Sequence, residues 1–332
     1  MSVLSVTDLT ISIGETPVVS DVSFELDRGE RVGLIGESGS GKSMTAFAVM
    51  GLLPDTMTVS GQIRLDGSNT LEMTEKQRCE LRGNRVGMVF QEPMTALNPT
   101  MRVGAQIAEV VRIHRGLRRR AAWQHAVDLL ARVEFPDPAA QARRYPHQLS
   151  GGQRQRVALA IAIACDPAVI LADEPTTALD VTVQAQMLDL MSRLVDEQGA
   201  ALLLISHDLA VVDRMCSRVV TMYGGRIVES GETRKIFGEP RHPYTAGLRS
   251  TSAAVSLDSD RTLSELPFIP GQVPGAGRFP PGCPFRTRCT RASEECATMP
   301  PLAAADERLL ACWHPITPTA SLAAAGTDGS ST

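Results

Sequence analysis

A glycine-rich segment, Gly36 to Ser43, has the residue types and the spacing to hold a chain of phosphates. It reads GESGSGKS, follows the apolar run Arg31 to Ile35 and precedes a helical pattern, which is the context that a phosphate-binding loop requires. Glycines let backbone N–H groups turn toward a phosphate, lysine adds a positive charge, and a serine hydroxyl suits Mg²⁺. The alternative is a glycine-rich turn without a ligand. The expected phosphate-binding residues are Gly36, Glu37, Ser38, Gly39, Ser40, Gly41, Lys42 and Ser43.

Two carboxylates, Asp173 and Glu174, follow a short apolar run in the segment VILADEP. An uncompensated pair of carboxylates at the end of a buried strand is costly, and a bound cation and a water molecule would relieve that cost. We therefore expect Asp173 beside Mg²⁺ and Glu174 beside the water that attacks the γ-phosphate. The alternative is that both acids serve as helix caps.

Two further polar residues end short apolar runs. His207, in LISHD, could stabilise charge at the γ-phosphate or orient Glu174, although a lone histidine is as often structural. Gln91, in VFQEP, could contact the metal or the attacking water, and its alternative is an ordinary loop amide. The predicted catalytic residues are Glu174, His207 and Gln91. The predicted magnesium ligands are Ser43, Gln91 and Asp173.

Composition limits the classes of protein to consider. With 332 residues, 43% of them hydrophobic and 21% charged, the chain can bury one large core and a smaller appended unit. A formal net charge of -4 counts against a nucleic-acid-binding protein. The start of the chain lacks the pattern of a secretory signal. The longest apolar run, Val157 to Cys165, is shorter than the roughly 20 residues that span a bilayer, so we expect a cytoplasmic protein that reaches a membrane only through a partner.

Hydrophobic patterns predict the elements that position these residues. Alternating stretches predict a half-exposed antiparallel sheet at Leu4 to Val6, Val22 to Leu26 and Gly61 to Leu65. Continuous apolar runs predict buried parallel strands at Val32 to Ile35, Val169 to Leu171, Ala201 to Ile205 and Val219 to Met222. Helical patterns occur at Ser43 to Gly51, Ala121 to Val133, Gln153 to Ala164 and Thr182 to Glu197.

These patterns predict an α/β fold with an antiparallel β subdomain, an inserted helical subdomain and a loop-rich C-terminal extension. The main domain is expected over residues 1–235, with the helical subdomain at about 92–152, where the strand signal disappears. Frequent prolines mark residues 236–318 as the C-terminal extension. Residues 319–332 are small and polar, and we expect them to be disordered.

A second segment, LSGGQRQRV at Leu149 to Val157, places bare backbone donors at the start of a helix. With this segment the chain resembles the ATP-binding cassette (ABC) ATPases, a branch of the P-loop NTPases, over roughly residues 1–235. The resemblance implies ATP and Mg²⁺ as cofactors. It also implies that two cassettes pair head to tail, so that the signature of one subunit covers the nucleotide of the other. On this resemblance Gln91 corresponds to the Q-loop, Thr177 to Asp180 to the D-loop and His207 to the switch histidine. The signature and D-loop residues expected to contact nucleotide are Ser150, Gly151, Gly152, Gln153 and Asp180.

Two more segments resemble a narrower group, the dipeptide/oligopeptide importer ATPases, which also includes nickel and other small-solute systems. They are Phe90 to Glu109 and EPRHPYTAGL at Glu239 to Leu248. The resemblance implies a second homologous ATPase subunit in a heterodimer, two transmembrane permease subunits, an external solute-binding protein and a place at the cytoplasmic face of the membrane. From residue physics alone, His242 to Tyr244 is a turn that enters a helix. Ile13 occupies the place where family members often have an aromatic ring that stacks on adenine. The alternative is a soluble ABC ATPase outside transport.

Four of the seven cysteines fall in the C-terminal extension, namely Cys283, Cys289, Cys296 and Cys312. In a reducing compartment we expect free thiols or metal ligands rather than disulfides. Four thiolates suit a four-iron, four-sulfur (4Fe-4S) cluster or a tetrahedral zinc ion, but the close CxxC pairs typical of zinc sites are absent. In the zinc case His314 is a substitute ligand. Some members of the peptide-importer group carry an iron–sulfur cluster in this region, so we expect a structural 4Fe-4S cluster, with zinc and unliganded thiols as the alternatives.

Overall fold

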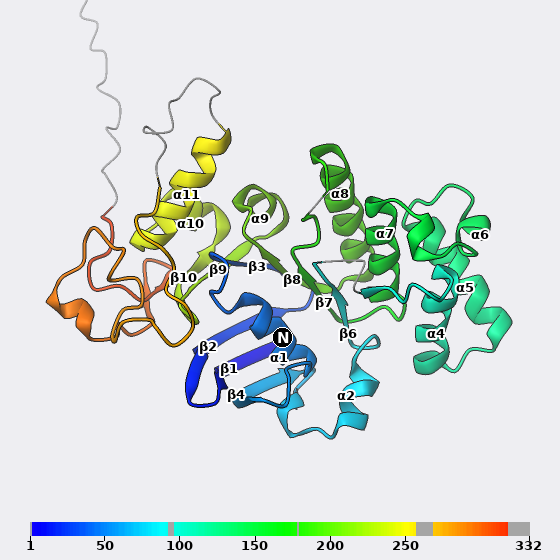
Figure 1. Cartoon of the computed structure of the whole chain (residues 1–332), viewed down its shortest axis with the longest axis horizontal. Coiled ribbons are helices and arrows are strands. Elements are labelled where there is room, and N and C mark those ends of the chain that lie inside the picture. Colours follow the sequence, from blue (N-terminus) through cyan, green and yellow to red (C-terminus); the bar gives the residue numbers. More distant parts are fainter. Residues whose placement is uncertain (1, 92–95, 178, 257–267, 318–332) are drawn as a thin grey trace, which may run out of the picture.

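The residues that the computed structural model describes are 2–91, 96–177, 179–256 and 268–317. One layer of the structure is an antiparallel sheet near the amino terminus (Figure 1). Its order is β2 (Thr16–Asp27), β1 (Ser2–Ile13), β4 (Met57–Leu65) and β5 (Ser68–Asn69). Leu4 of β1 faces Leu26 on one neighbour and Leu65 on the other, and all three side chains are buried. The predicted antiparallel subdomain is confirmed.

The second layer is a mixed sheet with eight strands in the described part of the chain. Its order is β11 (Ala303–Ala305), β12 (Arg308–Leu310), β10 (Arg226–Glu232), β9 (Arg218–Tyr223), β3 (Arg31–Ile35), β8 (Ala201–Ser206), β7 (Val169–Asp173) and β6 (Val86–Val89). The central strands β9, β3, β8, β7 and β6 are parallel. They are buried almost throughout, which explains their continuous apolar sequence and confirms the four predicted parallel runs.

Helix α1 (Lys42–Met50) lies between the two sheets (Figure 1). Its Ala46 and Val49 belong to one apolar cluster with Val6 of the antiparallel sheet and Leu34 of the mixed sheet. This packing holds the first residue of α1 close to the carboxyl end of β3. The loop between β3 and α1 is therefore fixed at the edge of the sheet where ligands of open α/β sheets bind.

The segment between β6 and β7 is helical, as expected for the inserted subdomain. Its apolar residues form one large cluster with the other face of the mixed sheet. The boundary at about residue 92 stays a prediction, because residues 92–95 lie outside the described residues. None of the helices in the described ranges is long and apolar enough to cross a bilayer. The other helices are α2 (Glu75–Leu81), α4 (Val103–Arg115), α5 (Arg119–Arg132), α6 (Pro138–Gln141), α7 (Gly151–Ala162), α8 (Val181–Gln198), α9 (Leu209–Met215), α10 (Thr233–Gly238) and α11 (Pro243–Ser256).

The C-terminal extension continues the mixed sheet. β12 pairs with β10, and a buried ion pair joins Arg308 of β12 to Glu229 of β10 at 3.0 Å. A small cluster that includes Tyr223, Tyr244 and Phe285 packs the extension against the main domain. The boundary at residues 235–236 stays a prediction, and the expected disorder of residues 319–332 lies outside the described residues.

Candidate nucleotide-binding and catalytic site

The glycine-rich loop Gly36 to Ser43 connects β3 to α1, as the sequence predicted. Gly36 has a φ of 151°, and a Cβ built there would lie 2.2 Å from the carbonyl oxygen of Met222 on β9. The loop therefore lies against the neighbouring strand so closely that only glycine fits. Close approach of the main chain leaves N–H groups free to face a phosphate group, which is the property that a phosphate-binding loop needs.

The side chain of Lys42 is folded back into this loop. Its Nζ donates hydrogen bonds to the carbonyl oxygens of Gly36 at 2.7 Å and Glu37 at 3.0 Å. Burial lowers the pKa of Lys42, while the carboxylates of Glu174 and Asp173 act in the opposite direction. The lysine head thus sits beside both acids that the sequence singled out, where a triphosphate would supply the negative charge that favours its ionised form.

Ser43 and Asp173 are brought together from α1 and β7. Ser43 Oγ donates a hydrogen bond to Asp173 Oδ1 at 3.1 Å, and Asp173 is only 4% exposed. Burial raises the pKa of the Asp173 carboxyl, because water no longer solvates its charge. A hydroxyl and a buried carboxylate are oxygen donors of the kind that Mg²⁺ prefers, and a cation here would offset the cost of burying the charge.

The carboxylate of Glu174 is the centre of a polar network. Its Oε2 accepts hydrogen bonds from Gln91 Nε2 at 3.1 Å and from Thr177 Oγ1 at 2.9 Å. Its Oε1 lies 3.0 Å from Nδ1 of His207, which follows β8. The three residues expected to be catalytic therefore meet within hydrogen-bonding distance.

The backbone at Glu174 is strained. Its φ is 44°, a left-handed conformation that is uncommon for a residue with a side chain. Its N–H donates a hydrogen bond to Ile205 O at 2.9 Å, so the edge of the sheet holds this conformation. Strain of this kind costs about 1 to 3 kcal/mol and is characteristic of functional sites.

The signature residues lie at another surface. Ser150 caps α7 by accepting a hydrogen bond from the Gln153 N–H at 3.3 Å, and Gln153 Oε1 accepts one from the Ser150 N–H. A groove of about 480 Å³ is lined by Ser150, Gly151, Gly152, Gln153 and Asp180, and by no residue of the glycine-rich loop. Asp180 is also the N-cap of α8, since its Oδ1 accepts a hydrogen bond from Val183 N at 3.0 Å. The structure thus groups the signature with Asp180, and not with the phosphate-binding loop of the same chain.

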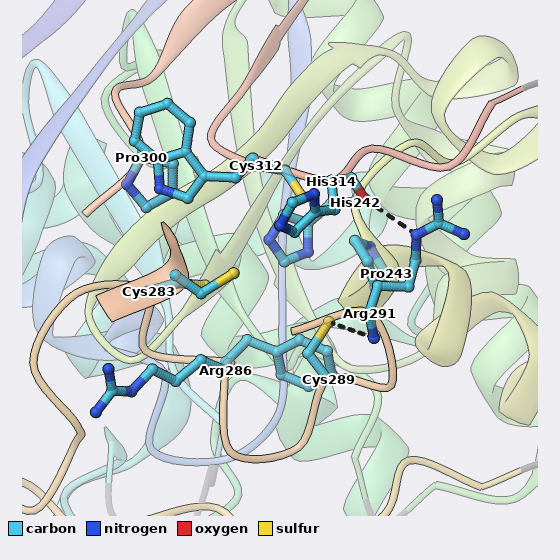
Figure 2. A pocket seen from close by; sticks show the side chains of 12 residues that line it. His242, Pro243, Cys283, Arg286, Cys289, Arg291, Pro300, Cys312 and His314 are labelled. Carbon is cyan, nitrogen blue, oxygen red and sulfur yellow. Dashed lines mark hydrogen bonds between the residues drawn. The ribbon is translucent and has the colours of Figure 1, made fainter. Parts of the chain in front are cut away.

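The four clustered cysteines line one small pocket in the C-terminal extension, together with His242 and His314. In Figure 2 the sulfur atoms of Cys283, Cys289 and Cys312 turn toward a common space. We call this space the cysteine pocket. Burial raises the pKa of the Cys312 thiol to about 11, so this thiol stays protonated at neutral pH unless a metal displaces the proton. Within the described residues, no group of three or more histidines, cysteines or acids is placed to hold a single metal ion.

His242 adds an unusual feature to this pocket. Its Nδ1 accepts a hydrogen bond from the Tyr244 N–H at 3.0 Å, as at the start of a helix, so the expected turn into α11 is present. The ring proton is consequently on Nε2. That atom is buried and has no hydrogen-bond partner among the described residues. A buried donor without a partner is costly and is rare in folded proteins.

Three residues make contacts with the nucleotide site that the sequence analysis did not predict. Thr177 was noticed only as part of the D-loop resemblance, although its hydroxyl binds Glu174. Tyr244 OH accepts a hydrogen bond from the Glu37 N–H at 2.6 Å, and Arg288 forms an ion pair with the Glu37 carboxylate. The sequence separation of these contacts is 207 and 251 residues, and no local pattern signals them.

Comparisons with known proteins identify the family of the chain. Residues 19–177 match the family described as ABC transporter, and residues 228–296 match the oligopeptide/dipeptide transporter, C-terminal region. A probable D,D-dipeptide transport ATP-binding protein of Escherichia coli is 48% identical over 91% of this chain and 92% of its own length. An oligopeptide transport ATP-binding protein of Salmonella typhimurium is 44% identical over 94% of each chain.

Solved structures give the same result for the fold. A dimeric ATP-binding cassette in a post-hydrolysis state, bound to ADP and Pi, has a TM-score of 0.62 and 28% identity, and the match covers 70% of this chain and 99% of that one. A component of an ABC transporter complex from Clostridium perfringens has a TM-score of 0.61 and 26% identity over 72% of this chain and 91% of that one. The chain therefore belongs to the ATP-binding subunits of ABC transporters, within the oligopeptide/dipeptide transporter family.

Proposed function

We propose that this ABC ATPase drives the uptake of dipeptides or oligopeptides by an importer in the cell membrane. The observation that carries the hydrolytic part is the network around Glu174, which joins Gln91, Thr177 and His207 on one carboxylate beside the phosphate-binding loop. The peptide part is supported by the names of the relatives and by the family of the C-terminal region.

The roles of the residues follow from their positions. Backbone N–H groups within Gly36 to Ser43, other than the Glu37 N–H that Tyr244 holds, bind the β- and γ-phosphates, and Lys42 supplies the positive charge. Bound Mg²⁺ would neutralise charge on these phosphates, and Ser43, Asp173 and Gln91 are the residues that would hold it. Glu174 accepts the proton of the attacking water, and His207 holds that carboxylate in place.

The signature groove suggests a second subunit. Because Ser150 to Gln153 line a groove without the phosphate-binding loop of their own chain, we propose that they complete the ATP site of a homologous ATPase. The reciprocal site would consist of this chain's loop and the partner's signature. A heterodimer with two composite sites follows, and the chain alone should be a poor ATPase.

The remaining partners are two transmembrane permease subunits and an external solute-binding protein, with this chain at the cytoplasmic face of the membrane. The test is uptake of labelled dipeptides and oligopeptides by cells that lack this chain. Uptake should return with the wild-type chain and not with Lys42→Ala. Restored uptake of nickel without uptake of peptides would show that nickel is the transported solute instead. Purification with neither permease subunit would indicate a soluble ABC ATPase instead.

We also propose that the cysteine pocket holds a 4Fe-4S cluster. Four cysteines line one pocket, and each would hold one iron of such a cluster, so their thiols need not converge on one point as the ligands of a single ion must. The Nε2–H of His242, which has no partner in the described part of the chain, is a suitable donor for a sulfide or thiolate sulfur. The cluster would crosslink Cys283, Cys289, Cys296 and Cys312 and stabilise a region with little apolar core.

Anaerobic purification tests this proposal. A broad absorption band near 400 nm, with stoichiometric iron and sulfide, is the expected result. Cys289→Ser should remove the band, whereas Cys79→Ser, at an exposed position on α2, should keep it. Stoichiometric zinc, or thiols without metal, would refute the cluster.

A further inference from the structure

A residue of the phosphate-binding loop is held by the C-terminal extension. The carboxylate of Glu37 forms a two-pronged ion pair with Arg288, at 2.6 Å between Nη1 and Oε2 and 3.1 Å between Nη2 and Oε1. The backbone N–H of Glu37 donates a hydrogen bond to Tyr244 OH at 2.6 Å. Both the side chain and the main chain of Glu37 are thus bound by residues far outside the ATPase motifs.

Arg288 is itself firmly placed. Its side chain is 5% exposed, and its Nε donates a hydrogen bond to Pro270 O at 2.8 Å. Its Nη1 also contacts Tyr223 OH at 3.2 Å, and the guanidinium lies over the rings of Tyr223 and Phe285 at 5.8 and 6.0 Å. A planar cation fixed by several partners pairs with a carboxylate in one orientation only.

The position of Glu37 makes this pairing important for nucleotide binding. A carboxylate within an anion-binding loop repels the phosphates that the loop must bind. Arg288 neutralises that carboxylate and directs it toward the extension. The carbonyl oxygen of Glu37 accepts a hydrogen bond from Lys42 Nζ at 3.0 Å, so the Glu37 peptide unit is held at its N–H by Tyr244 and contacts the lysine through its C=O.

We propose that Arg288 and Tyr244 are positioning residues for the phosphate-binding loop, which act through Glu37, so that the affinity of this subunit for ATP depends on its C-terminal extension. The proposal rests on the assignment of Gly36 to Ser43 as the phosphate site. Because Arg288 directly precedes Cys289, the contact between Glu37 and Arg288 also links the nucleotide site to the segment that carries the cysteine pocket.

The test is the affinity of the full-length chain for MgATP, measured by calorimetry, with the unfolding temperature of each variant recorded alongside. Arg288→Ala should raise Kd about 10-fold or more, which corresponds to about 1.4 kcal/mol. The matched control is Arg286→Ala: Arg286 also lines the cysteine pocket, but its guanidinium end extends away from the cysteine sulfur atoms in Figure 2. Among the described residues, the Arg286 side chain has no hydrogen-bond or ion-pair partner. Its Kd should equal that of the wild type.

A second variant separates this role from a loss of folding. In Arg288→Ala/Glu37→Gln, the glutamine keeps the size of Glu37 and carries no charge to repel phosphate, so Kd should return to within about 3-fold of the wild type, even if the unfolding temperature stays low. Wild-type affinity in Arg288→Ala, or a double variant as weak as the single one, overturns the proposal. Lys42→Ala separates the phosphate site from the positioning role. Unchanged affinity for MgATP in Lys42→Ala refutes the phosphate site itself. Lost affinity in Lys42→Ala together with wild-type affinity in Arg288→Ala refutes only the positioning role.

Discussion

Glu174→Gln should abolish hydrolysis and preserve ATP binding, and the hydrogen bonds of the site explain why. Glu174 Oε2 accepts from both Gln91 and Thr177, and Oε1 faces Nδ1 of His207. A glutamine can place its carbonyl oxygen where Oε2 lies and keep both donors. Its NH₂ group then donates to His207 Nδ1 if the histidine proton is on Nε2. The substitution thus removes the basic carboxylate and leaves the scaffold intact.

The size of the effect follows from the role that is removed. Loss of a general base costs about 10² to 10⁴ in rate. This corresponds to about 2.7 to 5.5 kcal/mol of activation free energy. Changes in hydrogen bonding contribute little to this loss of rate, because the glutamine side chain keeps each contact that Glu174 makes. Thr177→Val is the matched control, since it deletes one donor to Glu174 and retains the base, and we expect at most about a 10-fold loss there.

The assay is steady-state release of phosphate by this chain with its partner ATPase, together with Kd for MgATP and size-exclusion chromatography. Glu174→Gln should keep Kd within about 3-fold and accumulate a nucleotide-bound dimer, because ATP persists between the two subunits. Turnover within about 3-fold of the wild type would refute the base role. An equal loss of binding and turnover would instead indicate that Glu174 supports the structure of the site.

Three further substitutions test other parts of the site. Asp173→Asn should raise the unfolding temperature of the nucleotide-free chain at pH 7, because burial raises the pKa of Asp173 in the folded chain and its charge is then more stable in the unfolded chain. This gain in unfolding temperature should disappear below about pH 4, where the acid is protonated in both states. The stabilisation of the chain by MgATP should be lost at every pH. Gly36→Ala should lower the free energy of unfolding by about 1 to 3 kcal/mol, because the new Cβ would overlap the Met222 carbonyl oxygen; wild-type stability in chemical denaturation would contradict this. Ile13→Tyr, at a position 46% exposed at the end of β1, should strengthen ATP binding about 3-fold or more by stacking on adenine. An unchanged Kd in calorimetry would show that the adenine ring does not lie against residue 13.

The sequence predicts where the glycine-rich loop and the polar ends of the strands lie, because each of these parts is local. Gly36 to Ser43 must follow a strand and enter a helix, and Asp173 and His207 end apolar runs whose burial decides their structure. Parallel strands bring such ends together at one edge of the sheet, so their proximity follows from topology.

Contacts between the extension and the main domain are of another kind. Arg288 reads as one of several arginines in a proline-rich loop, and nothing near it in sequence names Glu37 as its partner. The pairing of β12 with β10 involves only two registered residue pairs, too few to create a recognisable strand pattern. The segment His242 to Tyr244 has one feature that the local sequence predicts and one that it does not. Its turn into α11 is a local property, whereas the hydrogen bond from Glu37 to Tyr244 OH depends on the packed structure.

The pairing of β12 with β10 also bears on solubility. Without the extension, β10 would present its open backbone N–H and C=O groups at the edge of the large sheet, beside the uncovered ring of Tyr223 on β9. An exposed edge of this kind is a template for association with other chains. The present edge strand, β11, has three residues, all exposed alanines, and is too short to serve as such a template. The extension thus also protects the cassette from edge-to-edge aggregation, and a cassette cut near residue 235 should precipitate where the full chain stays dispersed.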